Sequence, residues 1–501
     1  MNSKITYHDS AKKNPGAYIL MAMLAGFFGY IVTKEVQLPP AILIIGFLVG
    51  GAVLFVKGMS QPEIVTYVMV AYLPFSKVLA GDFGGFTQAL NATNLLVGFI
   101  LITWISGRYA QGEPLWTSSP LNGIIGIFIL MAVIALFRGS YYETGYLWLA
   151  FIELKRWITP IFLFFLVLNT VKERWMIKNI VITMVIVCTL VGLMAIYDYM
   201  EVGDVGSLEK SRIGGISEHS NSLAAFFNYY IFLPFGFFLM NRRKPKYWLL
   251  LVPFLIQFRG IMVTFSRGGY ISFAFGLCVI TFFRSKALFF LFLLAAGAMI
   301  LHPNFLPRGI HYRMAQTLEH QNMSYVEVSE DLEGSLESSA STRIKIWKAG
   351  LEIIKEHPFF GVGYDLFHLM LPRYLPGVQM DAHNTYLILA AEMGIPALLV
   401  FLLIVLITGI QTLILYYQTK DPFTKAFALG FLGGIAGLLM SNMFGSRLDS
   451  QEVSSYFWIL CALMVRLRII DKREAKAAKN VEALPPRPGE KLAWFERPGA
   501  Y

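Results

Sequence analysis

Apolar runs of membrane-spanning length recur along almost the whole chain. A transmembrane helix needs about 20 predominantly apolar residues, and a window of about that length finds about fourteen candidate segments. They cover residues 17–32, 41–56, 62–80, 93–106, 121–137, 148–170, 177–199, 222–240, 248–265, 269–283, 287–301, 384–416, 424–443 and 453–470. We therefore predict an all-α polytopic membrane protein with about 12–14 transmembrane helices and one long hydrophilic loop.

Composition agrees with this fold class. Of the 501 residues, 56% are apolar and only 15% are charged, whereas soluble proteins are about 45–50% apolar and about 25% charged. A soluble enzyme, a disordered scaffold and a secreted disulfide protein are thereby excluded. The net charge of +10 reflects basic residues that flank apolar spans, as orientation in a membrane requires, so we expect no nucleic acid as a partner.

The distribution of lysine and arginine predicts the orientation. The short loops on one side hold only Lys34, Arg138, Lys210, Arg212, Arg267 and Arg447, whereas most other basic residues lie at the ends and loops of the opposite side. By the positive-inside rule, both termini face the cytoplasm and the long loop faces outward. The predicted segments are a cytoplasmic N-terminus (1–16), a bundle of about eleven helices (17–301), an outer loop domain (302–382), C-terminal transmembrane helices (383–470) and a disordered tail (471–501).

The outer loop divides into two parts. Its first half is acidic and rich in serine, which predicts a mobile segment. Its second half, from Ser341 to His357, has apolar residues at helical spacing, namely Ile344, Trp347, Leu351 and Ile354. We expect an amphipathic helix there that uses this face to rest on the membrane side of the protein.

A glycine-containing loop on the outward side is a candidate anion site. It runs from Lys210 to Asn221 and places Arg212 beside Gly214 and Gly215, with His219 further on. Glycines let backbone N–H groups turn toward an anion that a guanidinium also contacts. The alternative is an ordinary turn with a solvated arginine.

A second candidate is the turn Thr264-Phe-Ser-Arg267-Gly-Gly, where one predicted helix ends and the next begins. It places Arg267 at a helix N-terminus, which favours anions. Arg259 lies eight residues earlier, inside an apolar helix, and an intramembrane arginine is a functional candidate. The alternative for Arg259 is a structural ion pair with Asp198 or Glu153, since buried charges must be paired.

A third candidate, Asp381-Ala-His383-Asn384-Thr-Tyr386, opens the segment 384–416. That segment is too long for one span, and Pro396 is expected to divide it into an interfacial helix and a true span. His383 at the membrane boundary can act as a general base near neutral pH. The alternative role is a helix cap or a hydrogen-bond donor.

The sequence carries no histidine pair with metal-ligand spacing, no phosphate-binding loop and no serine-hydrolase elbow. We therefore expect no metal and no cofactor, and neither nucleotide-driven transport nor serine hydrolysis.

Four blocks, in matching order, resemble the O-antigen ligase and polysaccharide polymerase superfamily of bacterial inner-membrane glycosyltransferases. They are Arg212-x-Gly214 leading to Asn221-x-Leu223; Ser266-Arg267-Gly268; Arg343-x-x-x-Trp347 leading to His357-Pro358-Phe-Phe-Gly361-Val-Gly363; and His383-Asn384-Thr-Tyr386 leading to Glu392-x-Gly394-Ile-Pro396. The resemblance covers about residues 205–445 and implies a GT-C-like helical architecture in the bacterial inner membrane, with the active site facing the periplasm.

The resemblance further implies an inverting, metal-independent transfer of a glycan from undecaprenyl diphosphate to an acceptor hydroxyl. The implied catalytic residues are His383, Arg212 and Arg267, because guanidinium forks bind phosphate bidentately and can replace a metal ion. His219, Asn221, Arg259, Arg343, Asn384 and Tyr386 are candidate substrate-binding residues.

Several functions share this chemistry. A ligase moves a finished glycan onto lipid A core, a polymerase moves a chain onto a new lipid-linked repeat, and a third group glycosylates protein. The nominal expectation is the ligase, with the O-antigen or exopolysaccharide polymerase as the alternative. A lipid-linked oligosaccharide flippase is a further alternative of another class, but it would place polar residues near mid-membrane.

Overall fold

A computed structural model of the chain describes residues 54, 56, 58, 62–79, 92–142, 145–202, 212–217, 219–302 and 340–482. Their regular secondary structure is helical, and none of the described residues lies in a strand. The predicted N-terminus, the first expected span, nearly all of the second, the acidic half of the outer loop and the last part of the tail lie outside these residues.

Most of the described helices lie in the predicted apolar segments, and the others lie in the predicted loops between them. They are α3 (Pro62–Tyr72), η1 (Leu73–Phe75), α4 (Ser76–Leu79), α5 (Ala92–Ala110), α6 (Asn122–Gly139), α7 (Tyr146–Thr170), α8 (Arg174–Val202), η2 (Gly215–Ser217), α9 (Ser220–Tyr230), α10 (Phe232–Asn241), η3 (Pro245–Leu250), α11 (Leu251–Val263), α12 (Arg267–Arg284), α13 (Lys286–Leu301), α16 (Ala340–Glu356), α17 (Phe367–Met370), η5 (Leu371–Arg373), α18 (Thr385–Met393), α19 (Ile395–Gln418), α20 (Pro422–Ser441) and α21 (Gln451–Glu482). Within the described part of the chain, 7 helical segments are long and apolar enough to cross a membrane. The all-α polytopic membrane fold is therefore confirmed.

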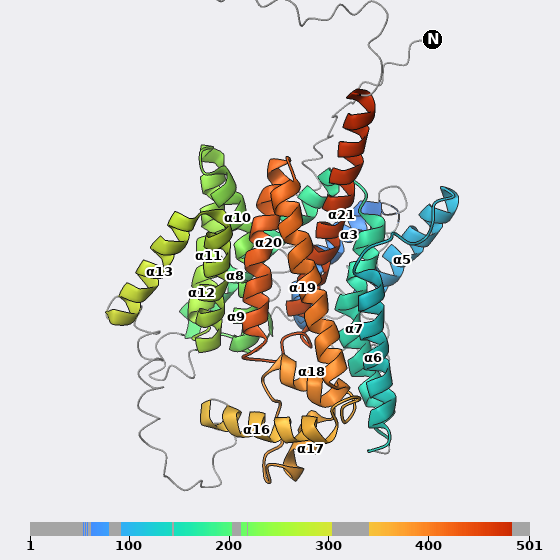
Figure 1. The fold of residues 1–501 in the computed structure, drawn as a ribbon, viewed down its shortest axis with the longest axis vertical. Helices are drawn as coiled ribbons and strands as arrows, with labels where there is room; N and C mark the ends of the chain where they lie inside the picture. Colours follow the sequence, from blue (N-terminus) through green and yellow to red (C-terminus); the bar gives the residue numbers. More distant parts are fainter. Residues whose placement is uncertain are drawn as a thin grey trace, which may run out of the picture.

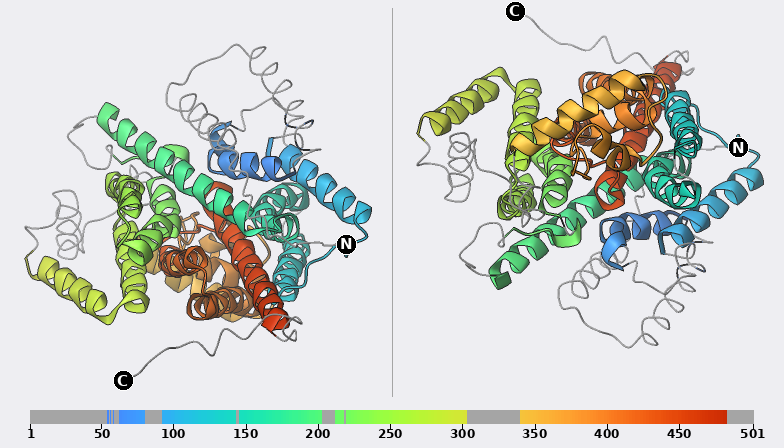
Figure 2. Two further views of the ribbon diagram at one scale, coloured as in Figure 1. Left: turned by 90° about the horizontal axis from the view of Figure 1, so that it is seen from above. Right: turned by 90° about the horizontal axis from the view of Figure 1, so that it is seen from below.

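The long helices run side by side, and a shorter layer closes one end of the bundle (Figure 1). In that layer α16 lies across the helix ends, next to α17 and α18, as the view from below shows (Figure 2). We call this end the α16 end. The opposite end, beyond which α21 projects, is called the α21 end.

Helix α20 lies at the centre of the bundle, in contact with α9, α10, α12 and α19. Small residues allow this close packing, as is common between membrane helices. A Cβ on Gly434 would lie 2.4 Å from the carbonyl oxygen of Tyr229, and one on Gly430 would lie 2.6 Å from that of Phe232. The glycines of α20 thus let the backbones of α9 and α10 approach it directly.

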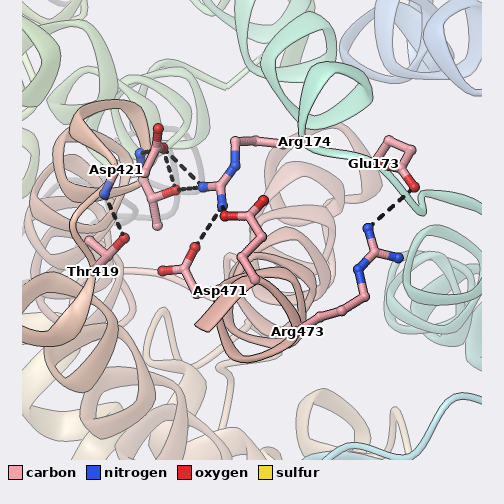
Figure 3. Close-up of polar contacts among 8 residues, drawn as sticks. Glu173, Arg174, Thr419, Asp421, Asp471 and Arg473 are labelled. Carbon is pink, nitrogen blue, oxygen red and sulfur yellow. Dashed lines mark hydrogen bonds and ion pairs between the residues drawn. The ribbon is translucent and has the colours of Figure 1, made fainter. Parts of the chain in front are cut away.

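Polar contacts join three helices at the α21 end (Figure 3). Arg174, the first residue of α8, lies 3.0 Å from Asp421, 2.8 Å from Asp471 and 2.8 Å from Glu474. Asp421 also caps α20 by accepting a hydrogen bond from the Thr424 N–H at 2.8 Å. Because one planar guanidinium contacts several carboxylates, the ends of α8, α20 and α21 are held together.

Two helix ends differ from the sequence expectations. Segment 384–416 is divided as predicted, but the break falls at Gly394, and Pro396 lies in the first turn of α19, where its missing N–H costs little. The predicted disordered tail is wrong for residues 471–482, because α21 continues without interruption to Glu482. Its first turns in this stretch are anchored by the contacts of Asp471 and Glu474 with Arg174.

The amphipathic helix of the outer loop is present as α16, but half of its predicted contact face is wrong. Ile344 and Leu351 are exposed, whereas Ile346 and Ile353 are buried. Gly350 causes the difference, since a Cβ there would lie 2.4 Å from the Leu387 side chain of α18. The absence of a side chain at Gly350 brings α18 close, and the buried face is centred on that contact.

Candidate functional site

The first two sequence candidates meet at the α16 end. The Arg212 guanidinium donates to the Asn221 side-chain oxygen at 3.0 Å and to the Thr264 carbonyl at 3.4 Å. The same Asn221 oxygen accepts a hydrogen bond from the Ser266 hydroxyl at 2.7 Å. The loop before α9 and the turn between α11 and α12, about fifty residues apart in sequence, therefore form one polar cluster.

Arg267 begins α12, as predicted. Ser266 is the N-cap residue, and its hydroxyl accepts a hydrogen bond from the Gly269 N–H at 3.2 Å. The helix dipole and the N–H groups of the first helical turn favour an anion at this position. Phe265, just before the cap, has a φ of 49°, and a left-handed backbone is unusual for an aromatic residue.

Sequence reasoning missed Arg447, in the loop between α20 and α21. Its side chain is buried and donates to the Ser222 hydroxyl at 2.7 Å. Together with Asn221 and Ser266 it lines a cavity of about 10 Å³, the size of one water molecule. The only signal in the sequence was its place among the few basic residues of the outward loops.

His383 belongs to a second polar group beside the first. Its Nδ1 lies 3.3 Å from the Asp381 carboxylate, which also accepts a hydrogen bond from the Ser446 hydroxyl at 2.8 Å. Ser446 directly precedes Arg447, so the loop after α20 joins the two groups. Burial alone would raise the pKa of Asp381, but the contacts with His383 and Ser446 outweigh it and lower that pKa. Asp381 is thus an ionised partner for His383.

Further charged residues surround Arg447. Burial lowers the pKa of Arg447 to about 10, and Arg343 of α16 repels its charge, whereas Asp381 and Asp449 attract it. Partial desolvation, and then repulsion by Asp381 and Asp365, raises the pKa of Asp449 to about 7, although its side chain keeps solvent access. Arg343 therefore lies near enough to act on the site electrostatically.

Two of the predicted substrate-binding residues make hydrogen bonds that hold α18 in place. Asn384 caps α18, where its side-chain oxygen accepts from the N–H groups of Tyr386 at 3.0 Å and Leu387 at 3.2 Å. The Tyr386 hydroxyl donates to the Leu439 carbonyl of α20 at 2.6 Å. Both interactions position α18 and thus His383 at its start. His219 is the N-cap residue of α9, and its side chain is exposed and makes no capping bond.

The motif around Gly361 and the motif around Gly394 pack against each other. The Ile395 N–H donates to the Pro358 carbonyl at 2.8 Å. A Cβ on Gly361 would lie 2.2 Å from the Glu392 backbone, and one on Gly394 would lie 2.2 Å from the Phe359 carbonyl. Both glycines have positive φ, so only glycine fits this close crossing.

Glu392 holds the turn at residues 365–367 in place. Its buried carboxylate accepts hydrogen bonds from the N–H groups of Asp365 at 2.9 Å and Phe367 at 3.1 Å. Burial, and then the charge of Asp365, raises its pKa well above the usual value. The motifs around Gly361 and Gly394 therefore pack together at the α16 end and fix the position of α18.

Arg259 lies apart from these groups. Its side chain is exposed, with the guanidinium 5.5 Å from the centre of the Tyr199 ring. The expected alternative, an ion pair with Asp198 or Glu153, is wrong, because among the described residues Glu153 contacts Arg156 and Arg259 has no carboxylate partner. A cation over an aromatic face compensates part of the charge.

Backbone strain is concentrated near the candidate residues. In the described part of the chain, the non-glycine residues with positive φ are Phe265, Asp365 and His383. Phe265 lies two residues before Arg267, the Asp365 N–H donates to the Glu392 carboxylate, and His383 is the candidate base itself. Such strained positions cluster at functional sites, and all three belong to the α16 end.

The fold and this region define a multi-pass membrane protein with basic residues and a histidine–aspartate pair at one end of its helical bundle. Residues 252–402, less than a third of the chain, match the family model described as O-Antigen ligase. The resemblance to the O-antigen ligase superfamily is thereby confirmed for this region, which contains Arg267, Arg343 and His383. It indicates a ligase- or polymerase-type membrane enzyme that acts on lipid-linked glycans. No curated protein matches the chain.

Proposed function

We propose that the protein is a bacterial inner-membrane glycosyltransferase of the O-antigen ligase type. It transfers a glycan from undecaprenyl diphosphate to an acceptor hydroxyl, without a metal and with inversion at the anomeric carbon. The observation that carries this proposal is the meeting of the Arg212–Asn221–Ser266 cluster, Arg447 and the His383–Asp381 pair at the α16 end.

The arginines act on the leaving group. The acceptor oxygen attacks the anomeric carbon while the bond from that carbon to the diphosphate oxygen breaks, and negative charge develops on the diphosphate. Preorganised donors aimed at this charge stabilise the transition state. Arg212 and Arg267 supply charge-assisted bidentate bonds, and Arg447 adds a buried positive charge at the cavity that it lines with Asn221 and Ser266.

His383 acts on the acceptor. The Asp381 carboxylate lies at Nδ1, so Nε2 is the nitrogen that can take the proton from the attacking hydroxyl. Asp381 stabilises the imidazolium that forms, and Asn384 and Tyr386 fix the position of the residue through α18. His383 and Asp381 thus form the proposed base and its positioning partner.

This chemistry requires the α16 end to face the periplasm and the α21 end to face the cytoplasm. Lys348 of α16 and Ala477 of α21 are exposed at these two ends. In a variant without its native cysteines, Lys348→Cys should react with an impermeant maleimide in intact spheroplasts, and Ala477→Cys only after permeabilisation. The reverse pattern would place the candidate site in the cytoplasm and contradict the proposal.

Transfer itself can be tested with the purified protein. We expect it to move an O-antigen glycan from undecaprenyl diphosphate to lipid A core, with inverted anomeric configuration in the product by NMR. Chelator should leave the rate unchanged, since guanidinium groups carry the charge stabilisation. Transfer to a second lipid-linked repeat in place of lipid A core would identify the polymerase, and loss of activity in chelator would contradict the metal-free mechanism.

A further inference from the structure

A second polar recess lies at the α21 end, far from the candidate transfer site. It has a volume of about 520 Å³, within the range of about 300–1,000 Å³ that is typical of ligand pockets. Its walls come from the end of α5, the segment that follows it, the segment between α7 and α8, and α21. The proposed transfer reaction makes no use of it.

Positive charge dominates the lining of this recess. The charged lining residues are four cations, Arg108, Lys172, Arg466 and Arg473, and two carboxylates, Glu113 and Glu173. Glu113 contacts both Arg108, at 3.1 Å, and Lys172, at 2.7 Å, and Glu173 contacts Arg473 at 3.5 Å. Three of the four cations thus contact the two carboxylates, and the charged residues that line the recess carry a net positive charge.

Arg466 is the fourth cation of the lining, and it contacts neither of these carboxylates. Its side chain is buried, at 7% exposed, and is held by the Leu168 carbonyl at 2.6 Å and the Thr117 hydroxyl at 3.1 Å. No carboxylate of the described residues lies within ion-pair distance of it. Arg108, also buried, bonds to the same Thr117 hydroxyl at 3.1 Å and to the Asn169 carbonyl at 3.2 Å. Two buried guanidinium groups thus donate to the same hydroxyl, and Glu113 is the carboxylate in contact with one of them. This arrangement suits the binding of an anion.

The surroundings select a lipid over a soluble anion. Ile469 and Ile470 also line the recess, and the last turn of α5 and the segment after it expose Tyr109 and Trp116 respectively. Tyrosine and tryptophan are enriched at the level of lipid headgroups. Basic recesses between transmembrane helices on the cytoplasmic side bind acidic headgroups, and the α21 end faces the cytoplasm in the orientation proposed above.

We propose that this recess binds the phosphate of an anionic phospholipid from the cytoplasmic leaflet, with Arg108 and Arg466 at its base and Lys172 and Arg473 at its rim. The bound lipid would complete the contact of α21 with α5 and α7. The inference rests on the proposed function only for the orientation of the α21 end, because the binding itself concerns the end of the bundle opposite the transfer site.

Lipid binding to the full-length protein in detergent can be measured by native mass spectrometry. The rim cations are the residues to replace, since the side chains of Lys172 and Arg473 are 37% and 64% exposed and their loss should leave the fold intact. Lys172→Gln and Arg473→Gln should each weaken the first bound phosphatidylglycerol about fivefold, and together about 25-fold. Arg468→Gln, on the same helix but outside the recess, should bind like the wild type.

Three results would overturn the proposal. One is undiminished phosphatidylglycerol binding by the double variant. Another is phosphatidylcholine binding to the wild type as tightly as phosphatidylglycerol, since the net positive charge of the recess then plays no part. The third is displacement of the lipid by equimolar inorganic phosphate, which would make the recess a site for a free anion.

Discussion

His383→Ala is expected to lower the turnover of glycan transfer by about 10²–10⁴-fold, the usual contribution of a positioned general base. Donor affinity should change little, because the arginines carry the diphosphate charge. Transfer rates at saturating donor, measured together with binding of the lipid-linked donor, test both statements. Weakened donor binding with normal turnover at saturation would show that His383 contacts the donor instead.

A matched control uses another histidine–aspartate pair at the same end. His368 of α17 lies 3.9 Å from Asp365 and takes no part in the proposed chemistry, so His368→Ala should transfer at the wild-type rate. Asp381→Asn tests the positioning role. It should lower turnover less than His383→Ala, because the imidazolium loses its ionised partner while the base itself remains. Wild-type turnover in Asp381→Asn would mean that Asp381 only supports the loop.

Arg267→Lys and Arg212→Lys should each lose about 10–100-fold in transfer while expression stays normal. Lysine keeps the positive charge but not the planar fork, and a lost charge-assisted hydrogen bond typically costs about 1.5–3 kcal/mol. Arg212→Lys also removes the donor to Asn221, so the geometry of Ser266 is disturbed as well. The measurement is the transfer rate at matched protein levels in the membrane.

Arg284→Lys is the control for these two variants. Arg284 is the last residue of the helix that Arg267 begins, and its guanidinium donates to the Leu239 carbonyl at the far end of the bundle. It should retain wild-type transfer. Near-full activity of both Arg267→Lys and Arg212→Lys would remove the bidentate diphosphate clamp from the mechanism.

Local sequence signals predicted the parts of the site that depend on chain neighbours. The turn from Thr264 to Gly269 was predicted to separate two helices and to place Arg267 at a helix N-terminus, and Arg267 is indeed the first residue of α12. The long segment 384–416 with Pro396 indicated two helices, and α18 and α19 are separate. Such features depend on contacts within about four residues, which capping groups and proline impose directly.

The partners of the site residues could not be predicted in this way. Arg447 meets Ser222 across 225 residues, and no local pattern distinguishes it from the other basic residues of the outward loops. Asp381 was visible two residues before His383, but its hydrogen bond from Ser446 spans 65 residues. Contacts of this kind depend on how α20 and α21 pack, and packing is not encoded by periodicity.

The sequence alone therefore determined the membrane class, the positions of most described helices and the resemblance of four motifs to one superfamily. In lipid the backbone must satisfy its hydrogen bonds internally, and apolar segments of spanning length do so by forming helices. These features can therefore be predicted from the local sequence. Tertiary structure decided which face of α16 is buried, that α21 continues to Glu482 and that Arg447 joins the site. Each of these depends on through-space contacts, with Leu387, Arg174 and Ser222 respectively, that exist only once the helices have packed.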